Sequence, residues 1–169
     1  MIEGDGHLTL APYEEWTSEI AQDPNSASLQ ELMQGLIDIV AVEGPMVCRR
    51  AYRLYNRAAG NVRLGSQIVR LMNRAMYRAV RLGHLQQSDE RRRGGQINQV
   101  VRVADTPEVV IRQRGPRKPE DIPPLEIRAV RETLLNQDRN LSEDQLVHRL
   151  AHVYKIGRVT AEIRKLLLV

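Results

Sequence analysis

The chain has 169 residues, enough for one or two domains, and 42% of them are hydrophobic, as in an ordinary globular protein. There is no Phe and only one Trp, so Leu, Val, Ile, Ala and Met must fill the core. A net charge of +4, carried almost entirely by Arg, makes nucleic acid a candidate partner, although one sequence cannot separate this from a coding bias.

Several classes of protein are excluded or disfavoured at once. No apolar run approaches the roughly 20 residues of a membrane span, and the first residues lack the basic and apolar regions of a secretory signal. We therefore expect a cytoplasmic protein with no membrane partner. A single cysteine, Cys48, excludes an intramolecular disulfide, and its place on a predicted helix favours a small core residue over a nucleophile.

Residues 1–27 are polar and rich in turn formers, and we expect an extended N-terminal arm there. Trp16 could pin this arm to the body of the protein by burying its ring. Ser28 and Glu31 have the spacing of a capping box, which predicts a helix that starts at Leu29 and stops at 43–45, the sequence Glu-Gly-Pro.

A unit of three helices and a hairpin is expected over residues 28–112. A second helix should run from about 47 to 59, and a third from about 66 to 82 with Ser66 near its cap. Two short strand-like runs then flank a polar tip at 88–95, which predicts a hairpin, and 109–112 could add a strand. Three helices followed by a hairpin is the order of a winged helix.

A stiff connector should follow, because residues 113–123 are rich in Pro, and further helices are predicted beyond it. They should cover about 124–136, 142–154 and 160–168, and Ser142 with Gln145 forms a second capping box. Residues 124–169 would then be a second helical unit, truncated before any hairpin.

The two units resemble each other in sequence. Residues 63–71 align with residues 158–166 at an offset of 95, and residues 52–54 align with residues 148–150 at an offset of 96. We therefore predict a mainly α fold of tandem winged-helix-like three-helix units, with a small β-hairpin wing in the first. Chance similarity between short amphipathic helices is the alternative.

At this point the chain resembles a known family. The run IVAVEGPMVCRRAYRLYNRAAGNVRLGSQIVRLMNRAMYRAVRLGHL, with DIPPLEIRAVRETLL after it, is similar to the C-terminal domain of very large bacterial superfamily-one helicases that carry a Vsr-like endonuclease domain. The resemblance covers roughly residues 29–169. It implies a domain that is neither the motor nor the nuclease, so it transfers no catalytic residue.

The third predicted helix carries the strongest functional signal. At 100° per residue, four of its Arg side chains fall within about 80° of one another, away from the apolar face around Ile68 and Ala75. We call Arg70, Arg74, Arg78 and Arg81 the Arg stripe. In a winged helix, this helix enters the major groove of DNA, where Arg contacts phosphates and guanine. The alternatives are a solvated face, or pairing with Asp38 or Glu43 of the first helix.

Further candidates for nucleic-acid binding lie beside that helix. Arg63 precedes it, and three consecutive arginines, Arg91, Arg92 and Arg93, occupy the predicted hairpin tip, where Arg could follow the backbone or minor groove. A solvated loop is the alternative at the tip.

No catalytic, cofactor or metal site is expected. The chain has no P-loop, nucleophile-elbow or CxxC motif, and His148 and His152 lack a third zinc ligand. We therefore expect a non-catalytic DNA-binding accessory protein, in or beside a bacterial helicase–nuclease or defence system, with duplex DNA and a helicase or nuclease subunit as partners. The alternative is a subunit that docks a larger protein.

Overall fold

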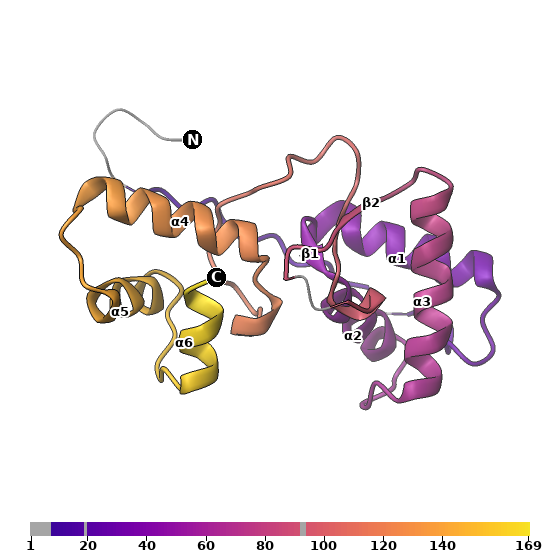
Figure 1. Ribbon diagram of the computed structural model, residues 1–169. Coiled ribbons are helices and arrows are strands. Elements are labelled where there is room, and N and C mark those ends of the chain that lie inside the picture. Colours follow the sequence, from indigo (N-terminus) through magenta and orange to yellow (C-terminus); the bar gives the residue numbers. More distant parts are fainter. Residues whose placement is uncertain (1–7, 19, 92–93) are drawn as a thin grey trace. The chain divides into compact units, whose positions relative to one another are not determined.

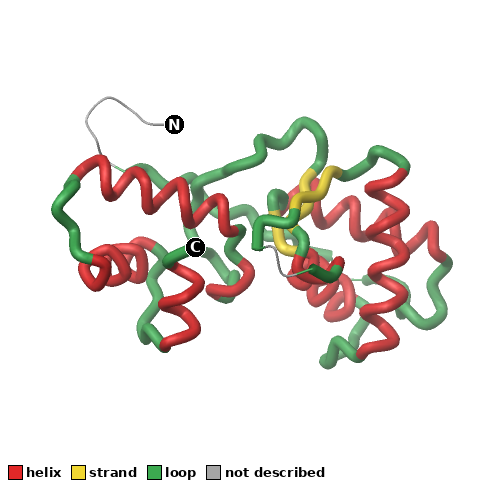
Figure 2. The backbone as a smooth tube through the Cα atoms, in the orientation of Figure 1, coloured by secondary structure: helices red, strands yellow, loops and turns green. Residues whose placement is uncertain are grey.

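The computed structural model describes residues 8–18, 20–91 and 94–169. This part of the chain is mainly helical, with six α-helices and one small three-stranded antiparallel sheet (Figures 1 and 2). It divides into two compact units. We call Glu14–Glu108 the sheet unit, and Val109–Val169, together with the N-terminal segment up to Tyr13, the C-terminal unit.

Helix α1 (Leu29–Glu43) begins and ends where the sequence predicts. The Ser28 hydroxyl accepts a hydrogen bond from the Glu31 backbone, and the Glu31 carboxylate accepts one from the Ser28 backbone, so the capping box is formed. Gly44 follows the last turn in an extended conformation. The buried face of α1 includes Leu36, Ile39 and Val40, which lie in the core of the sheet unit.

Helices α2 (Cys48–Ala58) and α3 (Ser66–Arg81) complete that core. The Tyr52 hydroxyl of α2 donates a hydrogen bond of 2.9 Å to Asn73 Oδ1 of α3. The Tyr55 ring lies so close to α1 that a Cβ at Gly35 would stand 2.4 Å from Tyr55 Cε2. The three helices are therefore joined by one directional bond and one close approach as well as by apolar packing.

The sheet joins segments that are far apart in the sequence. Strands β1 (Met46–Val47), β2 (Gln86–Ser88) and β3 (Val100–Arg102) lie in the order β1-β3-β2, with both neighbouring pairs antiparallel. The expected hairpin is thus present as β2 and β3. Strand β1 was not expected, because two residues between Pro45 and a helix carry no alternation that a sequence pattern could show.

Trp16 fixes residues 14–18 against the body of the sheet unit. Its side chain packs against the core, and its backbone N–H donates to Glu43 Oε1 at 3.0 Å. The same carboxylate accepts from Arg50 Nε at 2.6 Å and from Arg50 Nη2 at 3.1 Å, and both side chains are buried. Trp16 therefore plays the anchoring role expected of it.

The C-terminal unit consists of α4 (Pro124–Gln137), α5 (Glu143–Val153) and α6 (Ala161–Leu167) around a second apolar core. Ser142 forms the expected capping box with Gln145, and the Thr160 hydroxyl accepts from the Ile163 backbone. Each of these helices begins 95 residues after its counterpart among α1, α2 and α3. The offset found in the sequence therefore extends to all three helix starts.

The proline-rich segment 113–123 packs into the C-terminal unit, and it is not the exposed connector that its composition suggested. Arg117 is fully buried, donates from Nη1 and Nη2 to the two Glu126 oxygens at 2.7 and 2.9 Å, and lies over the Tyr13 ring. Ile122 is buried in the apolar core. Residues 109–112 add no full strand, since Arg112 makes one isolated parallel bridge with Ala11.

No helix among the described residues has the length and apolar character that crossing a bilayer requires.

Candidate nucleic-acid interface

Helix α3 is held by one face. Met72, Ala75, Met76 and Ala79 are buried in the core of the sheet unit. The turn that leads into the helix is also fixed, because Asn56 Nδ2 donates to the Arg63 carbonyl at 3.0 Å. The N-cap is Gly65, in an extended conformation and with no side chain to cap the helix, so Ser66 does not serve as the cap. Packing and the preceding turn therefore orient α3.

The opposite face of α3 is the Arg stripe. Arg70, Arg74, Arg78 and Arg81 are all exposed, as expected from their spacing. None of the four makes a hydrogen bond or an ion pair with any residue in 8–18, 20–91 or 94–169. Asp38 instead accepts from Gln34 at 2.8 Å, and Glu43 binds Arg50 and the Trp16 backbone. Neither carboxylate that could have neutralised the stripe does so.

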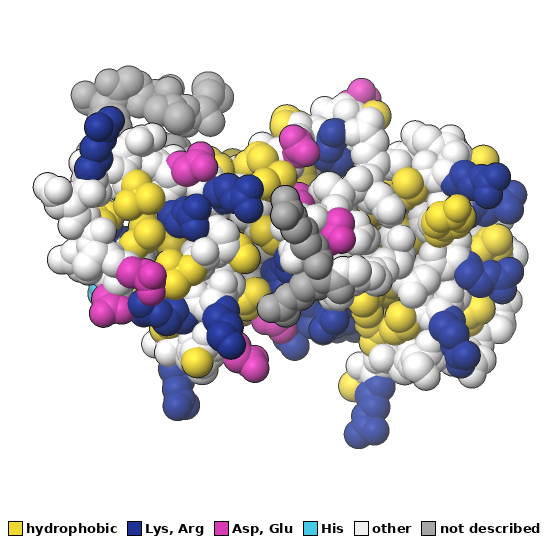
Figure 3. All heavy atoms as spheres, viewed as in Figure 1, with side chains coloured by type: hydrophobic (Ala, Val, Ile, Leu, Met, Phe, Trp, Pro, Cys, Tyr) yellow, Lys and Arg dark blue, Asp and Glu magenta, His cyan; other side chains and the backbone are white. Residues whose placement is uncertain are grey.

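Apolar surface lies within this cationic face. Tyr77 is 58% exposed and Leu82 is 54% exposed. Figure 3 shows Arg side chains around apolar ones over α3. A shallow groove at the C-terminal half of the helix is lined by Leu29, Arg74, Tyr77, Arg78, Arg81 and Leu82.

The sequence contained a signal for this groove. At 100° per residue, Tyr77 lies about 20° from Arg70 and about 40° from Arg81, so it stands at the edge of the Arg stripe.

The other arginines predicted to bind nucleic acid are less fully described by the structure than the Arg stripe. Arg63 is exposed in the turn between α2 and α3. Arg91 is half-buried after β2, so its guanidinium is less available than expected of a hairpin tip. Arg92 and Arg93 lie outside the described residues. The stripe is therefore the best-defined part of the candidate interface.

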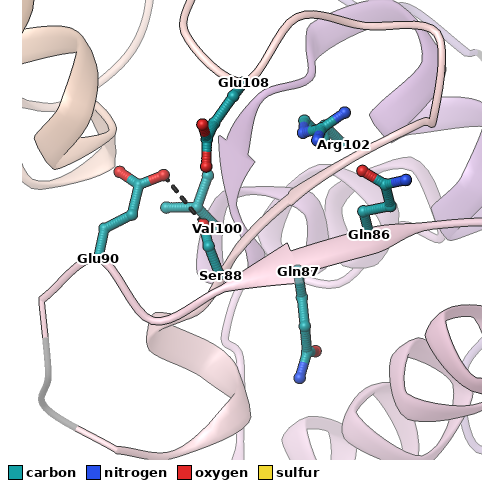
Figure 4. Close-up of a pocket in the computed structure, with 7 residues that line it drawn as sticks. All are labelled: Gln86, Gln87, Ser88, Glu90, Val100, Arg102 and Glu108. Atoms are coloured by element: carbon teal, nitrogen blue, oxygen red, sulfur yellow. Dashed lines mark hydrogen bonds between the residues drawn. The ribbon is translucent and has the colours of Figure 1, made fainter.

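A small polar cavity lies at the base of the hairpin (Figure 4). Its lining residues are Gln86, Gln87, Ser88, Glu90, Val100, Arg102 and Glu108. Ser88 Oγ donates to Glu90 Oε1 at 3.1 Å, and Arg102 Nη1 donates to the Thr106 carbonyl at 2.8 Å. Its one hydroxyl is thus paired with a carboxylate, and its guanidinium ties β3 to the following loop. These contacts position the hairpin, and the lining contains no His or Cys that could act as a base or nucleophile.

Cys48, His148 and His152 are the other reactive side chains that the sequence singled out. Burial raises the pKa of the Cys48 thiol to about 12, so the thiol stays protonated at neutral pH, as befits a core residue. His148 and His152 are exposed on α5. No group of three or more His, Cys, Asp or Glu in the described ranges is arranged to hold a metal ion.

No family model, curated protein or solved structure matches this chain.

Proposed function

We propose that this chain is a non-catalytic duplex-DNA-binding protein that uses a winged-helix-like unit. The observation that carries the proposal is the face of α3: four exposed guanidiniums without a partner among the described residues, opposite a face buried in the core. Guanidiniums in this state are available to an external polyanion. Phosphates supply most of the affinity in protein–DNA complexes.

The topology of the sheet unit supports the winged-helix interpretation. The elements follow the order α1, β1, α2, α3, β2, β3, and the central strand β3 pairs with both β1 and β2. Helix α1 and strand β1 thus precede a helix–turn–helix formed by α2 and α3, and the hairpin of β2 and β3 follows its second helix. In helix-turn-helix proteins the second helix lies in the major groove of DNA, and here that helix is α3.

The geometry of α3 suits contact with a duplex. From Arg70 to Arg81 the Arg stripe advances 11 steps, which is about 16 Å of helix, comparable with the roughly 12 Å width of the major groove. An Arg at the floor of that groove can bind guanine O6 and N7 with both arms, and the others can bind phosphates. Arg63, which is exposed in the turn before α3, would extend the contact to the flanking backbone.

We further propose that the chain acts in or beside a helicase–nuclease system. This rests on the resemblance of residues 29–169 to the C-terminal domain of large bacterial helicases. In such a system a non-catalytic DNA-binding unit would hold the substrate near the motor or the nuclease.

The test is a fluorescence-anisotropy titration with a duplex oligonucleotide over a range of salt concentrations. The log–log slope should be about −0.9 for each phosphate that the protein neutralises. The triple variant Arg70→Ala/Arg74→Ala/Arg78→Ala should bind more weakly and lose roughly one unit of slope for each phosphate contact removed. Its fold should survive, because these side chains lie opposite the buried face.

A matched control removes the same charge elsewhere. Arg128, Arg139 and Arg158 are exposed in the C-terminal unit, and their triple Ala variant should keep most of the wild-type affinity and slope. Equal losses in both triple variants would mean that net charge alone drives binding. Absence of binding to any nucleic acid at low salt would reject the proposal, and would favour an acidic protein surface as the partner of the stripe.

A further inference from the structure

The groove at the C-terminal half of α3 has a composition that phosphate binding alone does not explain. Three of its lining residues are cationic, and three offer apolar or aromatic surface: Leu29, Tyr77 and Leu82. Tyr77 and Leu82 each expose more than half of their surface, yet they belong to a helix whose other face packs well. Exposed apolar surface of this kind commonly marks a binding site.

Tyr77 is available for stacking. It makes no hydrogen bond, ring contact or cation–π contact with any other residue that the structure describes. Arg74 lies one turn before it and Arg81 one turn after it, so cationic groups stand on both sides of the ring along the helix. An aromatic ring between guanidiniums is the arrangement that proteins use to hold a base with its adjoining phosphates.

We infer that this groove binds an unpaired nucleotide, so that the preferred substrate is DNA with a single-stranded end or fork next to a duplex. The reason is steric. Inside a duplex both faces of each base are covered by neighbouring bases, and only base edges are open in the grooves. A ring can stack on a base face only where the base is unpaired. The inference rests on the proposed DNA binding and specifies its substrate.

The charge of the groove fits this occupant. Arg74, Arg78 and Arg81 repeat at intervals of one helical turn, about 5.4 Å, and line the groove together with its apolar side chains. No carboxylate lines the groove. A base would lie on Tyr77, with Leu29 and Leu82 excluding water at its edges, while the phosphates on either side meet the guanidiniums.

The experiment compares three oligonucleotides with the full-length protein: a blunt duplex, the same duplex with a single-stranded overhang, and the overhang strand alone. A 2-aminopurine at the first unpaired position reports stacking through quenching of its fluorescence. Wild type should bind the overhang duplex more tightly than the blunt one and should quench the probe. Tyr77→Ala should lose about 5- to 150-fold in overhang affinity, the range expected for one stacked base, and should therefore reduce the ratio of overhang affinity to blunt-duplex affinity.

Two further variants separate stacking from folding and from general apolar contact. Tyr77→Phe keeps the ring and should retain both the preference and the quenching. Val42→Ala removes an exposed apolar side chain of α1 outside the groove and should behave as wild type. Thermal melts of all variants test whether each is folded. We expect all of them to fold, because the Tyr77 side chain points away from the core.

The outcomes distinguish this inference from the proposed function. If wild type binds blunt and overhang DNA with equal affinity, the nucleotide subsite is overturned and duplex binding stands. The same conclusion follows if Tyr77→Ala weakens binding to both DNAs equally. Quenching that survives in Tyr77→Ala also overturns it. Binding to the single strand but not to the blunt duplex would support the subsite and reject duplex binding. Binding to none of the three rejects both.

Discussion

Glu43 is the residue on which Trp16, α1 and α2 converge. It is the last residue of α1, and its carboxylate accepts from the Trp16 backbone and from two nitrogens of Arg50. Glu43 and Arg50 are both buried, so each charge depends on the other for compensation. A charged pair in this setting specifies how the segments meet.

We expect Glu43→Gln to lower the free energy of unfolding by about 3–5 kcal/mol, because it removes the buried negative charge that Arg50 binds at 2.6 and 3.1 Å. Urea denaturation of the full-length protein measures this. Glu15→Gln is the control, since Glu15 lies 3.9 Å from Arg50 and is largely solvated, and it should cost less than about 1 kcal/mol. Equal effects of the two substitutions would show that the buried pair has no special role.

Sequence reasoning at the residue scale succeeded where the interaction is local. Ser28 and Ser142 cap their helices through partners three residues away, which a short motif specifies. The partner of Glu43 lies seven residues further, beyond a turn and a strand, and Arg50 was not singled out. Tyr77 was passed over for a different reason, because an aromatic residue on a helix is usually part of the core.

At the scale of elements, the packing of α1 against α2 depends on a residue without a side chain. Gly35 lies in the middle of α1, where Gly usually weakens a helix. The Tyr55 ring of α2 fills the space that a Cβ would occupy. The helices were predictable from their periodicity and caps, whereas this approach and the two-residue strand β1 depend on tertiary packing that periodicity does not encode.

Gly35→Ala should destabilise the sheet unit by about 1–3 kcal/mol, despite the better helix propensity of Ala, because the new methyl group would overlap the Tyr55 ring. Chemical denaturation followed by circular dichroism measures the change. Gly65→Ala is the control, since a Cβ there meets no atom within 4 Å, and it should cost less than about 1 kcal/mol, the ordinary preference for Gly over Ala at an N-cap. A Gly35→Ala protein as stable as wild type would mean that α1 and α2 can move apart without cost.

At the scale of the whole molecule, two three-helix arrangements share a 95-residue spacing but differ in what they expose. Helix α3 has 16 residues and an Arg stripe, whereas α6 has 7 residues. Arg164 of α6 pairs with Glu143 and Asp144 of α5. The repeat was visible in the sequence. The difference between the Arg stripe of α3, unpaired within the described part of the chain, and the ion-paired Arg164 of α6 was not, because it depends on which side chains meet in the folded chain. We therefore assign the proposed interface to the sheet unit alone.

The boundaries of the units also depend on packing that composition could not reveal. Pro-rich stretches are commonly exposed connectors, but 113–123 contributes Arg117 and Ile122 to the interior of the C-terminal unit. The boundaries fall at 13/14 and at 108/109 instead. Exposed glutamates lie at both, whereas Glu120 is half-buried and Glu126 is buried. One glutamate-specific protease can therefore compare the two kinds of position.

Brief digestion of the native protein with a glutamate-specific endoprotease should cut first after Glu14, Glu15 and Glu108, because cleavage requires a segment that can leave the surface and enter the protease. Mass spectrometry should then find fragments that begin at residue 109, with Glu120 and Glu126 intact. In denaturing urea all of these sites should be cut at similar rates, which controls for the preference of the protease for local sequence. Early cleavage after Glu120 in the native protein would instead show that 113–123 is an open connector, and that Arg117 and Glu126 do not hold it in place.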